Sequence, residues 1–318
     1  MSKIQLFENN SEIGAGTRGS SLGSKALRIA AYNSKSNFFK KFHPQLILDK
    51  NDMLDLSSDF NKAKRIDGIF HVCSDLSNKV SATLKKHHFP FILSGDHSSA
   101  IGTIAGIKSA YPEKRLGVIW IDAHADLHSP YTTPSGNVHG MSLMASLNHD
   151  NSNRRVHELD HLTYQQWEKL KKLNNIFPKI RVDDIVFLGL RSTEDPEDYF
   201  IIENKMNKIS VEHVRRNSPK LIAEKTLKEL SDCDLIYISF DVDSLDCDLI
   251  SYGTGTPVPN GFTEDEVAGL INNLLIDKRT CCFEMVEINP CLDNKQNKMA
   301  ETALRIIEHA SSIIEKRG

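Results

Sequence analysis

The chain has 318 residues, 40% of them hydrophobic and 25% charged, and its 39 Lys and Arg residues nearly balance its 42 Asp and Glu residues at a net charge of -3. These proportions are typical of a soluble globular protein and disfavour fibrous and disordered classes. The charge balance offers no basic excess for nucleic acid or an anionic membrane surface, and no apolar run approaches the roughly 18–20 residues that span a bilayer. We therefore expect neither nucleic acid nor a membrane among the partners.

The six cysteines include no C-x-x-C pair, and the N-terminus shows no basic segment followed by an apolar stretch. The first feature predicts reduced thiols, and the second predicts no signal peptide. Together they predict a cytoplasmic location.

Strand-like apolar runs alternate with helical patterns along the chain. In the first half we predict a short apolar segment at 45–48, a helix over 66–84, a strand at Phe89–Leu93, a helix containing Ile101 and Ile104, a strand at Leu116–Ile121 and a helix that begins with a capping box of Thr163 and Gln166. In the second half we predict a strand at Ile185–Leu190, a helix beginning at Ser218 and Pro219, a strand at Leu235–Phe240, a helix beginning with a capping box of Thr263 and Glu266, a strand at Cys282–Val286 and a last helix over 299–314.

Strands that are apolar on both faces and alternate with helices predict an α/β fold with a mostly parallel sheet covered on both sides. No stretch rich in Pro, Gly or Ser divides the chain, so we predict a single domain over 1–318. Ligands bind such sheets at the carboxyl ends of the strands. The residues that follow each strand are therefore the first place to look for a site.

Five predicted strands are followed by His and carboxylate residues. The segments are Ser94-Gly95-Asp96-His97-Ser98, Asp122-Ala123-His124-Ala125-Asp126-Leu127-His128, Arg191 to Glu197, Asp241-Val242-Asp243 and Glu287-Ile288-Asn289-Pro290. Each segment alone would be an ordinary turn or helix cap. Gathered at one sheet edge, so many ionised groups would repel one another unless cations were bound.

The spacing indicates a metal site. In an extended strand end, Asp122, His124 and Asp126 would point to one side because the side-chain period is two, and the same holds for Asp241 and Asp243. Imidazole and carboxylate ligands suit Mn²⁺, Fe²⁺, Co²⁺ or Zn²⁺. Six such ligands exceed the needs of one ion, so we predict a two-metal centre with ions ~3.5–4 Å apart and a bridging water or hydroxide.

The three ligand motifs resemble those of the arginase/agmatinase (ureohydrolase) family, and the resemblance extends from Glu12-Ile13-Gly14 to the final helix. It implies a three-layer α/β/α fold and a dinuclear manganese centre, with cobalt as the alternative. The implied ligands are His97, Asp122, His124, Asp126, Asp241 and Asp243.

The segment Thr133-Pro134-Ser135-Gly136-Asn137-Val138-His139-Gly140 resembles the part of bacterial arginases that holds the α-carboxylate of the substrate. The resemblance implies this role for Ser135 and Asn137, with help from Thr133. Short neutral donors orient a carboxylate without adding charge that would repel a guanidinium. The alternative is that these residues only form a turn.

Other positions take roles from the same resemblance. Glu287 would pair with the guanidinium, which offers a planar fork of donors. His139 would shuttle protons, Asp126 would both bind metal and transfer a proton, and Thr256 would line the site. A loop histidine without a catalytic role is the alternative for His139.

Two segments depart from the animal members of the family. Arg191-Ser192-Thr193-Glu194-Asp195-Pro196-Glu197 replaces an Arg-Asp-x-Asp pattern, which leaves Glu194, Asp195 and Glu197 as candidates for binding the α-amino group. His128 stands where animal members carry Asn. It remains a candidate donor to the α-carboxylate.

The resemblance implies hydrolysis of L-arginine to L-ornithine and urea by a hydroxide that bridges the metals. The alternatives are another ureohydrolase, namely an agmatinase, guanidinobutyrase or formiminoglutamase, and a non-catalytic metal-bound subunit. Family members are often trimers or hexamers, which leaves a homo-oligomer open.

Overall fold

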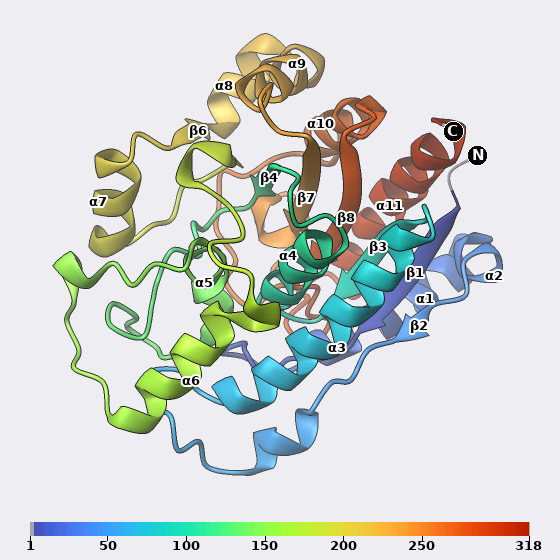
Figure 1. The fold of residues 1–318 in the computed structure, drawn as a ribbon. Coiled ribbons are helices and arrows are strands. Elements are labelled where there is room, and N and C mark those ends of the chain that lie inside the picture. The colour runs from blue at the N-terminus through green and yellow to red at the C-terminus, as the bar shows by residue number, and fades with distance from the viewer. Residues whose placement is uncertain (1–2, 318) are drawn as a thin grey trace.

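All eight strands of the structure lie in one parallel sheet, with the spatial order β2-β1-β3-β8-β7-β4-β5-β6 (Figure 1). This computed structural model describes residues 3–317. The strands are β1 (Ile4–Asn9), β2 (Gln45–Leu46), β3 (Phe89–Ser94), β4 (Leu116–Ile121), β5 (Ile185–Leu188), β6 (Asn207–Ile209), β7 (Leu235–Asp241) and β8 (Thr280–Val286).

The helices cover both faces of the sheet, which confirms the predicted α/β architecture. They are α1 (Gly23–Asn33), α2 (Phe38–Lys41), α3 (Ile66–Lys85), α4 (Ser99–Ala110), α5 (Ser142–Leu147), α6 (His161–Lys171), α7 (Asp195–Glu203), α8 (Val211–Asn217), α9 (Pro219–Glu229), α10 (Glu264–Ile276) and α11 (Lys298–Lys316). One face packs against α1, α9, α10 and α11, and the other against α3, α4, α5 and α6.

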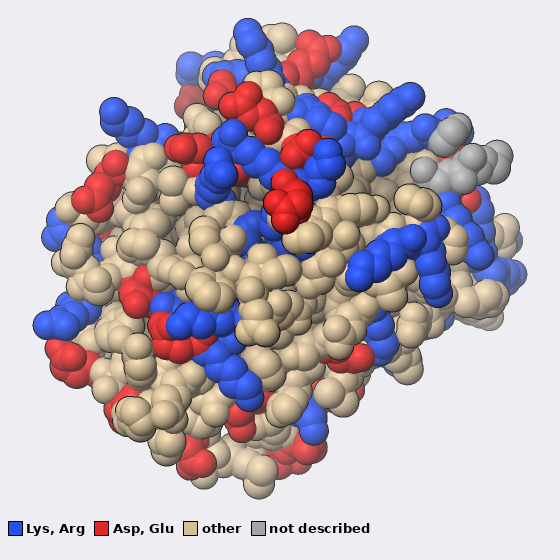
Figure 2. All heavy atoms as spheres, in the orientation of Figure 1, with Lys and Arg blue, Asp and Glu red and all other residues tan. Residues whose placement is uncertain are grey.

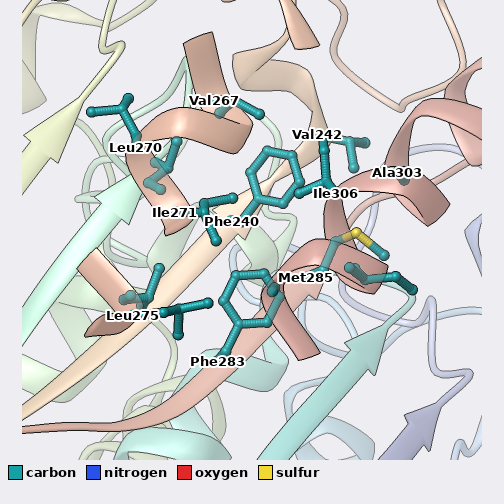
Figure 3. Packing of buried hydrophobic residues seen from close by; sticks show 14 of the residues in the cluster. Phe240, Val242, Val267, Leu270, Ile271, Leu275, Phe283, Met285, Ala303 and Ile306 are labelled. Atoms are coloured by element: carbon teal, nitrogen blue, oxygen red, sulfur yellow. The ribbon is translucent and has the colours of Figure 1, made fainter. Parts of the chain in front are cut away.

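Alternating side chains of each strand belong to different layers of the core, as the period of two requires. In β4, Ile119 and Ile121 pack on the α10/α11 side, whereas Val118 and Trp120 pack on the α3/α4 side. Figure 3 shows the first of these layers, where residues of β7 and β8 meet α10 and α11. Both layers exclude water, so the sheet is a rigid support for the loops at its ends.

The last two strands of the chain enter the middle of the sheet. β7 and β8 lie between β3 and β4, two strands that come much earlier in the sequence. The four central carboxyl ends therefore belong to β3, β8, β7 and β4. Reversals of strand order of this kind create the crevice in which α/β proteins bind ligands.

The predicted elements are present, with some differences at their ends. Helix α6 begins with Asp160 as its N-cap, whose Oδ1 accepts a hydrogen bond from the Thr163 backbone N at 2.9 Å, so the capping box of Thr163 and Gln166 was wrong. Strand β5 ends at Leu188 and does not reach residue 190, because Gly189 takes a left-handed backbone with φ +93°. The cap at Ser218 and the capping box at Thr263 are confirmed.

Several elements have no counterpart among the predictions. Strand β1 contains Gln5 and Glu8 among apolar residues, and it pairs along its whole length with β3. Helix α7 begins inside the acidic segment, with Glu194 as N-cap and a capping box closed by Glu197. Both elements depend on tertiary partners more than on a periodic apolar pattern.

None of the helices within residues 3–317 combines the length and apolar character that a membrane span requires. On the face drawn in Figure 2, basic and acidic side chains are interspersed.

Candidate metal centre and active site

The carboxyl ends of β3, β4 and β7 bring His and Asp side chains to one point. His97 comes from the turn between β3 and α4, Asp122 follows β4, and Asp241 ends β7. His97 Nδ1 lies 3.1 Å from Asp122 Oδ2 and 3.2 Å from Asp241 Oδ2. Asp126 Oδ2 lies 3.1 Å from the same nitrogen. These atoms form a first group with the geometry of a cation site.

A second group lies beside the first and shares one residue with it. Asp122, His124 and Asp243 bring their ligand atoms together, with His124 Nδ1 2.9 Å from Asp243 Oδ2 and 3.6 Å from Asp122 Oδ1. Asp122 thus contributes one oxygen to each group. Thr256 Oγ1 donates to Asp243 Oδ2 at 3.1 Å and supports the second group. All six predicted ligands are therefore brought together.

The backbone achieves this convergence by turning. Residues 122–124 form a bend, and Asp126 takes a left-handed conformation with φ +51°. Asp243 lies in a 3₁₀ turn that begins directly after β7. The expectation of an extended strand end with period two was therefore wrong, although the cluster itself is present. Left-handed backbone at a non-glycine residue is strained and concentrates at functional sites.

Burial makes this concentration of negative charge unfavourable without a cation. Burial raises the pKa of Asp241 well above its ordinary value, and the charges of Asp243 and Asp122 add to the rise. Burial and the charge of Asp122 likewise raise the pKa of Asp243 to about 6. Burial opposes charge on His97, but the close carboxylates of Asp122, Asp126 and Asp241 outweigh it and raise the pKa of His97 well above the ordinary range.

Two buried atoms identify where a cation fits. His97 Nδ1 and Asp122 Oδ2 lie 3.1 Å apart, yet neither has a hydrogen-bond partner of acceptable geometry. Buried polar atoms are nearly always paired, so orphaned atoms of this kind require an explanation. An imidazole nitrogen and a carboxylate oxygen aimed at one point fit a divalent metal ion.

The rest of the His97 ring is held from two sides. Its Nε2 lies 2.7 Å from Ser239 Oγ, so Nε2–H donates to Ser239 while Nδ1 faces the carboxylates. The indole of Trp120 stacks on the imidazole, with ring centroids 4.0 Å apart and planes 1° from parallel. Partners of this kind fix the orientation of a metal-binding histidine.

A cavity of about 300 Å³ opens directly over the metal-binding groups. Its volume suits a small molecule such as an amino acid. Its walls include four of the six predicted ligands and loops that follow β1, β4, β5 and β7. The lining residues are Gly16, Thr17, His124, Asp126, His128, Thr133, Pro134, Ser135, Asn137, His139, Gly140, Ser192, Glu194, Glu197, Asp241, Asp243, Gly255 and Thr256.

The predicted carboxylate-binding segment lines this cavity as a tight turn. The Gly136 backbone N donates to Thr133 Oγ1 at 2.9 Å, and the Asn137 backbone N donates to Ser135 Oγ at 3.1 Å. Gly136 has φ +75°, and a Cβ there would lie 2.1 Å from the backbone O of Asn61, so only glycine fits. The turn directs Ser135 and Asn137 to the cavity, so the turn and the binding roles are compatible.

The acidic segment supplies the wall near His128. His128 Nε2 lies 3.1 Å from Glu194 Oε2 and 3.6 Å from Glu197 Oε2. Glu197 also accepts the Leu127 backbone N at 3.0 Å, and burial raises the pKa of Glu197 to about 8. Asp195 opens α7 and is not among the lining residues, so the geometry favours Glu194 and Glu197 over Asp195.

Glu287 lies behind His139. Its Oε1 accepts the His97 backbone N at 3.0 Å and lies 3.1 Å from His139 Nδ1, while Oε2 lies beside Gly255, which lines the cavity. Burial opposes charge on His139, but the hydrogen bond to Glu287 outweighs it and raises the pKa of His139 to about 9. His139 therefore carries a proton at neutral pH in this environment.

Six lining residues were not predicted from the sequence as site residues, namely Gly16, Thr17, Pro134, Gly140, Ser192 and Gly255. Gly16 and Thr17 belong to the loop after β1, and Ser192 belongs to the loop after β5. The rule that sites follow strand ends would have found the first two if β1 had been recognised as a strand. Ser192 lay within a segment already singled out, but its type gave no specific signal.

Comparisons with known proteins agree with this geometry. The model of the arginase family matches residues 4–312. The chain is 37% identical over 246 residues to an arginase of Bacillus subtilis, covering 77% of this chain and 76% of that one. It is 30% identical over 314 residues to an arginase of Bacillus caldovelox, and the match covers 96% of this chain and 97% of that one. The crystal structure of an arginase from Bacillus cereus matches with a TM-score of 0.80 at 30% identity and covers 98% of both chains. The chain belongs to the arginase family.

Proposed function

We propose that the protein hydrolyses L-arginine to L-ornithine and urea with two divalent ions, Mn²⁺ or its alternative Co²⁺, at the two His/Asp groups. The observation that carries this proposal is the shared residue Asp122, which joins the groups at the base of a cavity of amino-acid size. Two divalent ions held at these groups would lower the pKa of a bound water and supply hydroxide near neutral pH.

The ligands divide by group. His97, Asp122 and Asp241 would hold one ion, with Asp126 beside His97, and Asp122, His124 and Asp243 would hold the other. Imidazole and carboxylate oxygen suit Mn²⁺ and Co²⁺. Burial raises the pKa values of three of the carboxylates, Asp126, Asp241 and Asp243, so the binding of an ion would favour their deprotonated forms and release protons.

The α-carboxylate and α-ammonium groups of the substrate would lie at the wall of the cavity that faces away from the metal-binding groups. Ser135 and Asn137 line the cavity as neutral donors for the α-carboxylate, and Glu194 supplies a negative charge for the α-ammonium group. His128 lies between these two walls, 3.1 Å from Glu194. Because His128 replaces a neutral amide, we propose that it donates to the α-carboxylate while Glu194 keeps it oriented.

The reacting end of the substrate would lie over the ligands. Glu287 has one oxygen occupied by His97 and His139 and a second beside the cavity wall, which suits the pairing with the guanidinium. Asp126 lines the cavity, and burial raises its pKa, so it is suited to accept a proton and pass it to the departing amine. His139, whose pKa is raised to about 9, can give the departing amine the second proton that makes it an ammonium group, and can take a proton back from the water that becomes the next hydroxide.

Urea release tests the proposal. Metal-free protein is loaded with Mn²⁺ or Co²⁺ and given L-arginine, agmatine or 4-guanidinobutyrate, with the Asp126→Asn variant as the matched control. We expect urea from L-arginine with wild type and little with the variant. Urea mainly from agmatine would overturn the substrate while keeping the chemistry, and no urea from any compound at full metal loading would indicate a non-catalytic protein.

A further inference from the structure

Glu284 is a fully buried carboxylate in the centre of the sheet, directly beneath the metal-binding groups. It lies on β8 with 0% exposure, and no ion pair involves it within residues 3–317. Three hydroxyl groups donate to it instead: Ser94 at 2.7 Å and Ser99 at 2.6 Å to Oε1, and Tyr237 at 2.7 Å to Oε2. A buried charge without hydrogen bonds would be strongly unfavourable, so these donors allow Glu284 to occupy this position.

Two of the donors flank the turn that carries His97. Ser94 is the last residue of β3, and Ser99 is the first residue of α4. One oxygen of Glu284 therefore holds both ends of the six-residue segment from Ser94 to Ser99 at the same point. Fixing both ends of a short turn limits where His97 can be.

The third donor reaches the His97 ring by another route. Tyr237 and Ser239 lie two residues apart on β7 and so share a face of the sheet, and Ser239 pairs directly with Glu284 on β8. Burial and the charge of Glu284 raise the pKa of Tyr237 well above its ordinary value, while a hydrogen bond with Ser239 acts in the opposite direction. Ser239 Oγ in turn lies 2.7 Å from His97 Nε2.

The donors along this route run in one direction. In the tautomer that leaves His97 Nδ1 free for a metal ion, Nε2–H donates to Ser239, and the Tyr237 hydroxyl donates to Glu284. The Ser239 hydroxyl proton is then free to turn toward the Tyr237 oxygen, which lies on the same face of β7. Each group donates once, and the chain ends on a carboxylate. A histidine whose second nitrogen donates into such a chain is oriented and becomes a stronger metal ligand.

We propose that Glu284 is a positioning residue that sets the metal affinity of the His97 group through Tyr237 and Ser239 and through the two ends of the His97 turn. The inference rests on the metal centre of the proposed function and extends it to a residue that touches neither ion nor substrate. Its effect is confined to one ion, because the contacts of Glu284 lead to His97 and none of the three donors contacts His124 or Asp243.

The test is a calorimetric titration of the metal-free protein with Mn²⁺. Glu284→Gln removes the charge and keeps the volume. Its oxygen can still accept from Ser94 and Ser99, but its amide nitrogen donates and cannot accept the Tyr237 hydroxyl proton, so the chain from His97 must reverse or break. We expect this variant to lower the affinity for one of the two Mn²⁺ ions on the order of tenfold and to leave the affinity for the other unchanged. Tyr237→Phe should weaken the same ion, because it interrupts the chain and leaves the serine contacts intact.

Two further variants locate the effect. In a His124→Asn background, only the His97 group keeps all of its ligands. The loss of Mn²⁺ affinity caused by Glu284→Gln should therefore persist there in full. Tyr111→Phe is the matched control, because it removes a hydroxyl that donates at 3.0 Å to the backbone O of Leu84, away from both groups. The melting temperature of each metal-free variant verifies that it folds.

The outcomes separate the two proposals. Two ions bound by wild type with unchanged affinities in Glu284→Gln would overturn the role of Glu284 and leave the proposed function in place. Equal losses of affinity for both ions would also overturn this role, because they would indicate a general loosening of the fold. A wild type that binds no Mn²⁺ would overturn both this inference and the metal centre.

Discussion

Strands β7 and β8 take part in two regions with opposite character. Along their length, Phe240, Phe283 and Met285 pack against α10 and α11 and are essentially inaccessible to water (Figure 3). At their carboxyl ends the same strands present Asp241 and Glu287, which are equally buried but charged. The first region gains stability from apolar burial, and the second loses it to repulsion between carboxylates.

This contrast separates stability from function along the direction of the strands. On the face covered by α10 and α11, apolar side chains pack against one another and need no other molecule. At the carboxyl edge, burial raises the pKa values of Asp241 and Asp243, and the charges of neighbouring carboxylates raise them further. Changes in the first region should therefore alter stability, and changes in the second should alter activity.

Asp126→Asn should give the largest effect. It removes a ligand beside His97 and a proton-transfer group together, so we expect kcat to fall about 10²–10⁴-fold. The metal-free variant should be no less stable than wild type, because burial raises the pKa of Asp126 and Asn removes that unfavourable charge. Urea assays, metal analysis and thermal unfolding measure the three quantities. Full turnover in this variant would contradict the assigned site.

Leu270→Ala tests the other side of the contrast. Leu270 is fully buried on α10 against the sheet (Figure 3), and such truncations lower the free energy of unfolding by about 2–5 kcal/mol. We expect this loss in denaturant unfolding while the metal stoichiometry and kcat of the folded protein stay near those of wild type. A variant that folds well but has lost an ion would show that the two regions are not separate.

Ser135→Ala with Asn137→Ala should narrow the preference for L-arginine over agmatine. Hydrogen bonds to a charged group contribute about 1.5–3 kcal/mol each, and water can replace part of this at the exposed Ser135. We expect kcat/KM for L-arginine to fall about tenfold or more and that for agmatine to change little. Equal proportional losses would mean that the turn only shapes the loop.

Acidification should lower activity, because the ligands must be deprotonated to hold the ions and hydroxide is the nucleophile. On the alkaline side, a second decline should follow the loss of the His139 proton, with an inflection at or below about 9 because bound cations lower that pKa further. His139→Asn should remove the alkaline decline. A rate that is flat from acid to alkaline pH at saturating Mn²⁺ would contradict the mechanism.

The stability of the metal-free protein should depend on pH in the opposite sense from that of most proteins. Burial raises the pKa values of Asp96 and Asp243 to about 6, above the ordinary 3.8. Folding therefore takes up protons, so stability is highest below pH ~4 for these groups and declines as pH rises through 6, by at most about 1.4 kcal/mol per pH unit for each group. Thermal unfolding between pH 5 and 7 measures it. Bound Mn²⁺ should reverse the trend.

The sequence predicts the composition of the metal centre better than its geometry. The six ligands follow from the rule that parallel strands end at one edge, together with motifs of known type. The bend at 122–124 and the left-handed backbone of Asp126 do not follow, because they depend on how α7 and the next loop pack against that segment. Alternation of apolar residues assigns faces to strands but does not identify their neighbours.

The cavity wall was the least predictable part. Thr17 and Ser192 reach the cavity from loops after β1 and β5, and neither residue type is distinctive. Glu284 gave no signal beyond a polar residue inside an apolar strand. Its role depends on pairing with Ser239 across two strands, and strand order cannot be read from local patterns.

The late entry of β7 and β8 into the sheet also bears on how the molecule is made. His97, Asp122, His124 and Asp126 leave the ribosome long before Asp241 and Asp243, and the contact of Ser94 with Glu284 joins positions 190 residues apart. Before β7 and β8 are synthesised, the first six strands can pair only as the two outer parts of the sheet, β2-β1-β3 and β4-β5-β6, with the middle still open. A nascent chain thus holds most of its ligands without a complete cation site, and its metal affinity appears in one step when the final two strands close the gap.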